Sequence, residues 1–252
     1  MAMMKVKRRF KTAFILGAGQ GLRLRPLTKH CPKPLLEIGG RPIITYAMDH
    51  LLSVGVDRFI VNIHHAPQVY FEKFPDQRWR GAPIIFRYEP LLLDTGGGLK
   101  NIEDLLDSDE TIFCYNGDVI ANLSLIELMK THEERKPEAV LALRSTGPQL
   151  NVSINEKNEI CDFRNALKNP GIKACLFTGI YTINTSFLEH LQAGKPESII
   201  SAFINRITEK PGAILGVVLD QGDWYDAGSP EYYAQLKNKI PKPEARCNHT
   251  RS

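Results

Sequence analysis

The sequence predicts an α/β fold in which helices cover a mixed, mostly parallel central sheet. Up to residue 145, short apolar runs alternate with segments whose apolar residues recur at helical spacing. Strands that alternate with helices form βαβ units, which connect parallel strands by right-handed crossovers. Beyond residue 145, two short apolar runs flank residues 155–158, and they indicate a hairpin that adds antiparallel strands to the sheet.

Each element is predicted from its own pattern. The strands are short apolar runs bounded by glycine, proline or polar residues, and they lie at residues 12–16, 58–63, 84–88, 111–115, 139–144, 151–154, 159–163, 176–183 and 213–219. The helices have apolar residues three and four positions apart, and they lie at residues 42–54, 98–106, 123–134, 185–191, 198–208 and 230–239. We find no segment long enough to be a linker, so residues 12–240 are predicted to form one domain.

The composition is that of a globular protein with a sizeable core. The chain has 252 residues, of which 43% are hydrophobic and 24% are charged. Its apolar-rich stretches are far shorter than the ~18 residues of a membrane span, so we expect no membrane partner. The apolar run that follows the basic N-terminus is also too short for a secretory signal. The five cysteines form no Cys-x-x-Cys pair, which favours free thiols in a reduced compartment and a cytoplasmic protein.

Positive charge is concentrated at the start of the chain. Residues 1–36 hold nine of the 32 Lys and Arg residues and none of the 28 Asp and Glu residues. A basic N-terminal segment followed by a net acidic remainder suits the binding of a local anionic ligand better than the binding of a nucleic acid. We therefore expect no nucleic-acid partner. We interpret residues 1–11 as a solvated basic leader and residues 241–252, which lack periodicity, as a tail.

A glycine-rich segment follows the first predicted strand. Gly17, Gly19 and Gly21 let backbone N–H groups approach a phosphate closely. The segment does not fit a dinucleotide fingerprint, because Leu22 stands where the third glycine is needed and Pro26 prevents a long helix. It does not fit a P-loop either, because the Gly-Lys-Ser/Thr that a P-loop requires is absent.

Basic side chains follow these glycines. Arg23 and Arg25 come directly after them, and Lys33 lies between two prolines that stiffen the segment and hold its ammonium outside regular structure. We interpret Arg25 as a solvated neighbour of Arg23.

These glycines and basic residues resemble the signature of the sugar-1-phosphate nucleotidyltransferases, also called nucleoside-diphosphate-sugar pyrophosphorylases. The matching run is Gly17-x-Gly19-x-Gly21-x-Arg23-Leu24-x-Pro26-Leu27-Thr28, followed by Pro32-Lys33-Pro34-Leu35. The resemblance extends over about residues 12–240 and implies a three-layer, Rossmann-like nucleotidyltransferase fold. Within the family, Asp94-Thr95-Gly96-Gly97-Gly98 and Asn62-x-His64-His65 look closest to N-acetylmuramate-1-phosphate uridylyltransferases and to mannose- or heptose-phosphate guanylyltransferases.

Three later segments agree with the resemblance. Residues 93–98 look like the family's second glycine loop, which faces the nucleobase and the sugar. Asn116-Gly117-Asp118 follows a predicted strand, where open α/β sheets bind ligands. The segment that begins at Trp224 is similar to the family's Trp-x-Asp-x-Gly, although Ser229 before Pro230 is by itself typical of a helix cap.

The resemblance implies that a nucleoside monophosphate passes from a nucleoside triphosphate to a sugar 1-phosphate, with release of pyrophosphate. Arg23 and Lys33 would be the catalytic residues, and Asp118 and Asp226 would hold Mg²⁺, the implied cofactor. The residues implied to bind the nucleotide are Leu16, Gly17, Ala18, Gly19, Gln20, Gly21, Thr95, Gly96, Gly97 and Asn116. Those implied to bind the sugar are Asp94, Thr178 and Gly179. The expected partners are the triphosphate and the sugar phosphate, and the chain would act as a monomer or a homo-oligomer.

One departure from the family leaves the sugar open. Many relatives have Glu-Lys-Pro after the hairpin, but this chain has Asp162-Phe163-Arg164-Asn165 there, and its own Glu209-Lys210-Pro211 is predicted to be a helix end. A choline-phosphate cytidylyltransferase and a nucleotide-sugar-binding regulatory subunit without activity are the alternatives. A glycosyltransferase of related topology is disfavoured, because Asp118 is followed by Val119 and Ile120 rather than by Asp-x-Asp.

Overall fold

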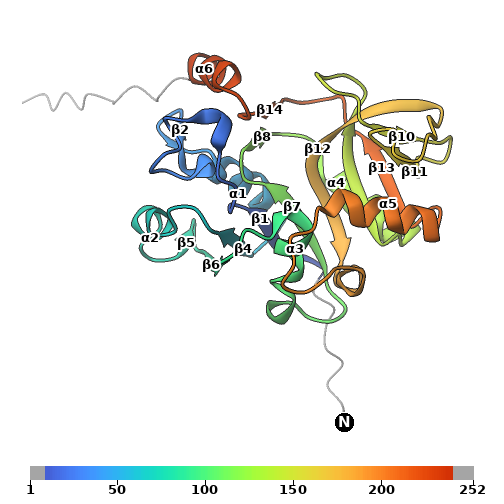
Figure 1. The fold of residues 1–252 in the computed structure, drawn as a ribbon, viewed down its shortest axis with the longest axis horizontal. Helices are drawn as coiled ribbons and strands as arrows, with labels where there is room; N and C mark the ends of the chain where they lie inside the picture. The colour runs from blue at the N-terminus through green and yellow to red at the C-terminus, as the bar shows by residue number, and fades with distance from the viewer. Residues whose placement is uncertain (1–8, 241–252) are drawn as a thin grey trace, which may run out of the picture.

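The computed structural model describes residues 9–240, and their centre is one mixed sheet. Ten strands belong to it: β1 (Arg9–Leu16), β4 (Arg58–Ile63), β5 (Arg78–Trp79), β6 (Ala82–Tyr88), β7 (Thr111–Asn116), β9 (Ala139–Arg144), β10 (Val152–Ile154), β11 (Ile160–Phe163), β12 (Lys173–Asn184) and β13 (Ile214–Val218). Their order is β11-β10-β12-β7-β1-β4-β6-β5, while β9 also pairs with β12 and β13 pairs with β9. Figure 1 shows the β10–β11 hairpin at one side of the molecule and β5 and β6 at the other.

The centre of the sheet is parallel. β7, β1, β4 and β6 run in one direction, and β12 is antiparallel to β7. In β7 the first five residues are buried, as expected for a strand that is covered on both faces. The predicted α/β class, the mixed sheet and the 151–163 hairpin are therefore confirmed.

Helices cover both faces of the sheet. The helices are α1 (Ile44–Leu52), α2 (Gln68–Lys73), α3 (Asp94–Lys100), α4 (Leu125–Arg135), α5 (Ile199–Glu209) and α6 (Pro230–Lys239). Buried residues of α1, α2 and α4 pack in one hydrophobic cluster with one face of the sheet, and those of α3 and α5 pack in a second cluster with the other face. The result is the predicted three-layer arrangement.

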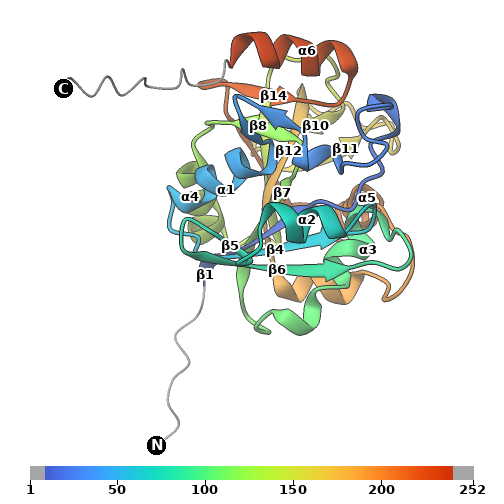
Figure 2. The ribbon, with the colours of Figure 1, turned by 90° about the vertical axis from the view of Figure 1, so that its left-hand side faces the viewer.

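A smaller assembly lies above the central sheet. It contains α6 and two short strand pairs, β2 (Glu37–Ile38) with β3 (Arg41–Pro42) and β8 (Val119–Ala121) with β14 (Trp224–Asp226). Figure 2 shows α6, β14 and β8 together at one end of the molecule. A third apolar cluster, which includes Leu24, Ile120 and Leu236, holds this assembly together.

The structure moves some predicted boundaries. The first strand begins at Arg9 rather than at residue 12, because the buried ring of Phe10 packs against Phe113 and His132. Residues 9–11 of the predicted leader therefore belong to the sheet, while residues 1–8 and the predicted tail, 241–252, lie outside the described residues. The segment predicted as a helix at 185–191 is a 3-10 helix, Thr185–His190.

The largest correction concerns residues 93–106. The sequence predicts a glycine loop followed by a helix at 98–106, but α3 begins at Asp94, contains all three glycines and ends at Lys100. A separate 3-10 turn, Glu103–Leu105, follows it. The physical reason is that the backbone of residues 195–199 packs directly against the first two glycines and favours the helix.

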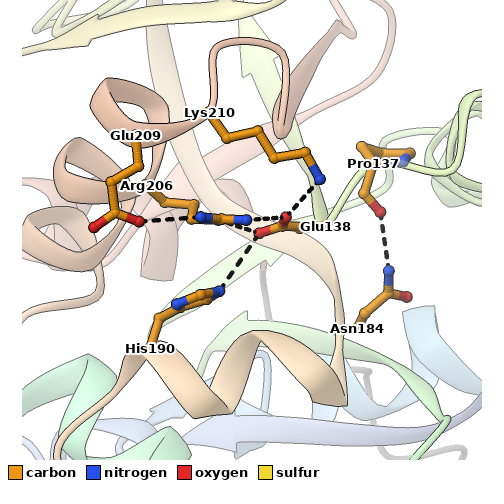
Figure 3. A network of polar contacts seen from close by, with 7 residues as sticks. All are labelled: Pro137, Glu138, Asn184, His190, Arg206, Glu209 and Lys210. Atoms are coloured by element: carbon orange, nitrogen blue, oxygen red, sulfur yellow. Dashed lines mark hydrogen bonds and ion pairs between the residues drawn. The ribbon is translucent and has the colours of Figure 1, made fainter.

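An ionic network fixes α5 to the sheet (Figure 3). It lies at the end away from the carboxyl ends of the parallel strands, because Glu138 directly precedes β9, which runs in the same direction as β7. Glu138 accepts hydrogen bonds from Arg206 Nε and Nη2, both at 2.7 Å, and from Lys210 Nζ at 3.0 Å. Burial by itself raises the pKa of Glu138, but these hydrogen bonds and charges outweigh it and lower the pKa. Glu209-Lys210-Pro211 is therefore a helix end, as predicted, and Lys210 serves the fold.

Candidate active site

The predicted site residues gather at the carboxyl ends of the central strands. Leu16 ends β1 and is in register with Asn62 near the end of β4 and with Asn116 at the end of β7. Ligands of open α/β sheets bind at this edge. Two cavities open here, one of about 650 Å³ and one of about 950 Å³. Both are lined by Leu16, Arg23, Asp94, Thr95, Asn116 and Gly228, so the cavities join.

Gly17 anchors the first glycine segment and does not line either cavity. Its N–H donates to Asn62 Oδ1 at 2.8 Å, and its carbonyl accepts from the Tyr70 hydroxyl at 2.9 Å. A Cβ at this position would lie 2.6 Å from the Asn62 carbonyl oxygen. In the structure the protein itself uses the Gly17 N–H, and a contact of this residue with a phosphate stays a prediction.

The next four residues do face the smaller cavity. Ala18, Gly19, Gln20 and Gly21 line it, and among the described residues we find no acceptor for their backbone N–H groups. Gly21 has the positive φ of 61° that favours glycine, and its carbonyl accepts from Thr28 Oγ1 at 2.8 Å. The segment is thus held at both ends, while the backbone between is available to an anion.

The second glycine segment is the first half of α3, and its glycines serve packing. The N–H groups of Gly96 and Gly97 donate to the Glu197 carbonyl at 2.8 and 3.0 Å. A Cβ on Gly97 would overlap the Lys195 carbonyl, and one on Gly96 would lie 3.0 Å from the Glu197 carbonyl. Gly96 and Gly97 line neither cavity, and their contact with a nucleotide stays a prediction.

Asp94 and Thr95 are the part of α3 that lines the cavities. Asp94 has a φ of 60°, which is unusual for a residue other than glycine, and its Oδ1 accepts from the Thr95 N–H at 2.6 Å. Thr95 Oγ1 accepts from the Ile199 N–H at 2.9 Å, which fastens the start of α3 to the start of α5.

The charged residues predicted for the site converge. Lys33 Nζ contacts Asp118 Oδ2 and lies 3.7 Å from Asp226 Oδ1. Lys33 is the first residue of a short 3-10 helix, rather than outside regular structure as predicted, and its side chain is only 11% exposed. Gly228 packs against Asp226 and Arg23, because a Cβ there would lie 2.8 Å from Asp226 Oδ1 and 3.2 Å from Arg23 Nη2. Arg25 is exposed and lines neither cavity.

Two carboxylates, those of Asp118 and Asp226, lie beside Lys33 Nζ and could hold a metal ion together with other ligands. Burial and the neighbouring charge of Asp118 raise the pKa of Asp226, although Lys33 and Arg23 oppose this shift. Asp226 Oδ1 is also buried without a hydrogen-bond partner among the described residues. In that part of the chain no group of three His, Cys, Asp or Glu side chains lies close enough to enclose an ion. A pair of carboxylates fits Mg²⁺, which keeps waters and substrate oxygens as its other ligands.

The histidine pair of the sequence motif has structural contacts. His64 Nδ1 is hydrogen bonded to the Glu89 carbonyl at 2.7 Å, and His65 Nε2 to the Thr28 carbonyl at 2.8 Å. These rings therefore fix two loops beside the site.

The larger cavity contains the residues predicted for the sugar. Gly179 has a φ of 78° and packs against Asn116, whose side chain a Cβ would overlap. The hydroxyl of Thr178 donates to the Ala142 carbonyl at 2.8 Å, so only the backbone of Thr178 is left for a ligand in this cavity. Beside them, Arg164 lines the cavity on an exposed turn, and Phe163 and Phe177 form part of its wall.

Sequence reasoning missed one wall of this cavity. Tyr232, Gln235 and Lys239 of α6 line it. They recur at helical spacing, so the helix prediction already placed them on one face, but nothing in the sequence shows which face meets the site.

Comparison with known proteins identifies the family of this chain. The pattern described as "Nucleotidyl transferase" matches residues 12–242. The chain belongs to this family. The family match confirms the resemblance that the sequence shows, and it agrees with the predicted fold class. Among residues 9–240, none of the helices has the length and apolar character needed to cross a bilayer.

Curated relatives of this nucleotidyl transferase family member are sugar-phosphate enzymes by name. A probable mannose-1-phosphate guanylyltransferase 1 of Oryza sativa is 31% identical and covers 94% of this chain and 69% of its own. The mannose-1-phosphate guanylyltransferase of Mycobacterium tuberculosis is 28% identical over 93% of this chain and 67% of its own. The chain thus spans about two thirds of these relatives.

Solved structures share the fold. HddC from Yersinia pseudotuberculosis superposes with a TM-score of 0.75 at 19% identity and covers 92% of this chain and 100% of its own. A UDP-glucose pyrophosphorylase complexed with UDP-glucose has a TM-score of 0.75 at 18% identity and covers 91% of this chain and 97% of its own.

Proposed function

We propose that this protein transfers a nucleoside monophosphate from a nucleoside triphosphate to a sugar 1-phosphate. In the reaction, an oxygen of the sugar phosphate forms a bond to the α-phosphorus. The bond from that phosphorus to the bridging oxygen breaks, and pyrophosphate leaves with the electron pair. The observation that carries the proposal is the convergence of Arg23, Lys33, Asp118 and Asp226 where the two cavities join.

The smaller cavity suits the triphosphate. The N–H groups of residues 18–21 would bind the β- and γ-phosphates, and the Arg23 guanidinium, which lies at the junction, can grip two phosphate oxygens. Lys33 adds a positive charge beside them. Because both substrates are anions, positioning and positive charge account for most of the catalysis, and no protein nucleophile is needed.

Asp118 and Asp226 are the residues that would hold Mg²⁺, whose charge offsets that of the phosphates. The raised pKa of Asp226 and the lack of a hydrogen bond to its buried Oδ1 support this role, because a bound cation would lower that pKa and give this oxygen a partner. Lys33, which is paired with Asp118 without ligands, then becomes available to the phosphates.

The larger cavity suits the sugar phosphate. Asp94, the backbone of Thr178 and Gly179, and Arg164 are the groups that would contact it. GTP with mannose 1-phosphate is the first substrate pair to test, because several relatives carry that activity in their names. UTP with N-acetylmuramate 1-phosphate is the second, on the sequence resemblance. The free thiols of Cys31 and Cys161 and the triphosphate substrate fit a cytoplasmic enzyme.

Pyrophosphate release from four triphosphates, each combined with several sugar phosphates and with choline phosphate, tests the proposal. Arg23→Ala should lower kcat about 10²–10³-fold without unfolding the protein, because it removes one charge-stabilising donor. Asp118→Asn should weaken the response of the rate to Mg²⁺. Tight binding of a nucleotide sugar without pyrophosphate release would favour the regulatory alternative, and activity with choline phosphate would favour the cytidylyltransferase.

A further inference from the structure

One buried carboxylate joins the two walls of the smaller cavity. Glu89 follows β6 and is fully buried. Its Oε1 accepts from Asn62 Nδ2 at 2.8 Å, and its Oε2 accepts from the Leu93 N–H at 3.1 Å, one residue before α3. The carboxylate therefore touches β4 on one side and the start of the second glycine segment on the other.

Asn62 extends this link to the first glycine segment. Its side chain is buried, and its Oδ1 accepts the Gly17 N–H at 2.8 Å. A side-chain amide accepts with its oxygen and donates with its nitrogen. The orientation of Asn62 is therefore fixed from both ends, by Gly17 and by Glu89.

The partners of Glu89 are unusual for a buried acid. Both side-chain oxygens accept hydrogen bonds from neutral N–H donors, an arrangement that suits a carboxylate because it needs acceptors only. Among the described residues no Lys or Arg forms an ion pair with it, whereas Glu138 has Arg206 and Lys210. Burial raises the pKa of the Glu89 carboxyl, in contrast to that of Glu138. Charged pairing is the usual way to keep a buried acid, so the fold retains Glu89 at a cost in stability.

The third glycine of α3 fits the same link. A Cβ on Gly98 would lie 2.8 Å from Asn62 Nδ2 and 2.9 Å from Glu89 Oε1. Any larger residue would push α3 away from the pair. The approach of α3 to β4 is therefore set by the Glu89–Asn62 contact.

We infer that Glu89 is a positioning residue for the nucleotide. Through Asn62 it holds residues 18–21, and through Leu93 it holds Asp94 and Thr95, so that the two walls of the smaller cavity keep a fixed separation. The inference rests on the proposed function in that the ligand of this cavity is a nucleoside triphosphate. It predicts that a defect at Glu89 weakens nucleotide binding much more than sugar-phosphate binding.

Exchange of the amide and the carboxylate between positions 62 and 89 tests whether this pair positions the nucleotide. In Glu89→Gln the side chain has one acceptor for two donors, so one hydrogen bond is lost, and KM for the triphosphate should rise about tenfold with little change in KM for the sugar phosphate. In the double variant Asn62→Asp with Glu89→Gln, the new carboxylate at position 62 accepts from the Gly17 N–H and from the new side-chain amide at position 89. The oxygen of that amide accepts from the Leu93 N–H. All three hydrogen bonds return, and KM for the triphosphate should fall back toward that of the unchanged protein.

Glu138→Gln is the matched control, because it alters a half-buried acid that lines neither cavity and should lower the melting temperature without moving either KM. Amide hydrogen exchange on the same samples separates this inference from the proposed function. In Glu89→Gln, exchange should accelerate in residues 17–21 and in α3 together, with or without catalysis. Equal exchange in Glu89→Gln and the unchanged protein, or no recovery in the double variant, would overturn the inference. Absence of pyrophosphate release by the unchanged protein, with the exchange result intact, would overturn the proposed function and leave the link between the two segments.

Discussion

The two glycine-rich segments of this protein have the same number of glycines and opposite uses. Residues 17–21 and 94–98 each contain three glycines. The first is an irregular loop whose middle N–H groups face a cavity, while the second is helical and buried, and its N–H groups are used by the protein. Gly19 has no atom within 4 Å of where a Cβ would stand, whereas Gly97 has no room for one.

The difference comes from what surrounds each segment. Side chains of Asn62, Tyr70 and Thr28 hold the first segment at its two ends and leave its centre to a ligand. The backbone of residues 195–199 covers the second and approaches it because the glycines carry no side chains. A run of glycines therefore indicates close approach, but its neighbours decide whether a ligand or the protein itself approaches.

Gly97→Ala should have the largest effect on stability. The new Cβ would overlap the Lys195 carbonyl, which is backbone and cannot rotate away. Overpacking of this kind costs about 1–3 kcal/mol of the free energy of unfolding. Urea denaturation measures it, and an unchanged midpoint would show that the 195–199 segment moves freely.

Gly19→Ala is the matched substitution in the first segment and should have the opposite profile. Its surroundings are open and its φ is not positive, so the free energy of unfolding should change by no more than about 0.5 kcal/mol. The methyl group would protrude toward the phosphates, and KM for the triphosphate should rise about tenfold, as one extra carbon in a binding site does. Steady-state kinetics with the triphosphate varied gives the value. A loss of stability with an unchanged KM would mean that both segments serve packing.

Thr95→Val should have a smaller effect on stability. The hydroxyl of Thr95 accepts the Ile199 N–H at 2.9 Å, and valine leaves that buried donor without a partner. The expected loss is about 1 kcal/mol of unfolding free energy, and Thr95→Ser, which keeps the acceptor, should lose much less. Thermal unfolding of the two variants side by side measures the difference. Equal losses in the two variants would contradict the assignment to this hydrogen bond, because Thr95→Ser keeps the acceptor.

The fold could be predicted from the sequence where pattern and packing agree. The bounds of β4, β9 and α6 match the prediction, because their apolar spacing reflects the surfaces they bury. For α3 the local preference was misleading. Glycine disfavours helix, so the sequence indicated a loop, but packing against residues 195–199 outweighs that preference. β8 and β14 have three residues each and pair across about a hundred residues of chain, so their short sequences carry no usable period.

The charged part of the site was predictable because Arg23, Lys33 and Asp118 follow strand ends or recognisable motifs. The use of individual N–H groups was not. That Gly17 donates to Asn62 depends on the register of β1 against β4, which places the two residues side by side. The sequence likewise gives no sign that Glu89 is buried, because its partners lie at the ends of other elements.

Arg25→Ala should have the smallest effect, and it tests whether charge near the first segment is enough. Arg25 is two residues from Arg23, but it is exposed and lines neither cavity. Salt screens the field of a solvated charge over about 8–10 Å at ordinary ionic strength. The loss of Arg25 should therefore change kcat and both KM values by no more than about twofold. Arg23→Ala, measured in parallel, removes the same charge from the cavity itself. A comparable loss in both variants would show that the positive field of the whole segment matters, whereas a large loss only for Arg23 would assign the effect to its contact with the phosphates.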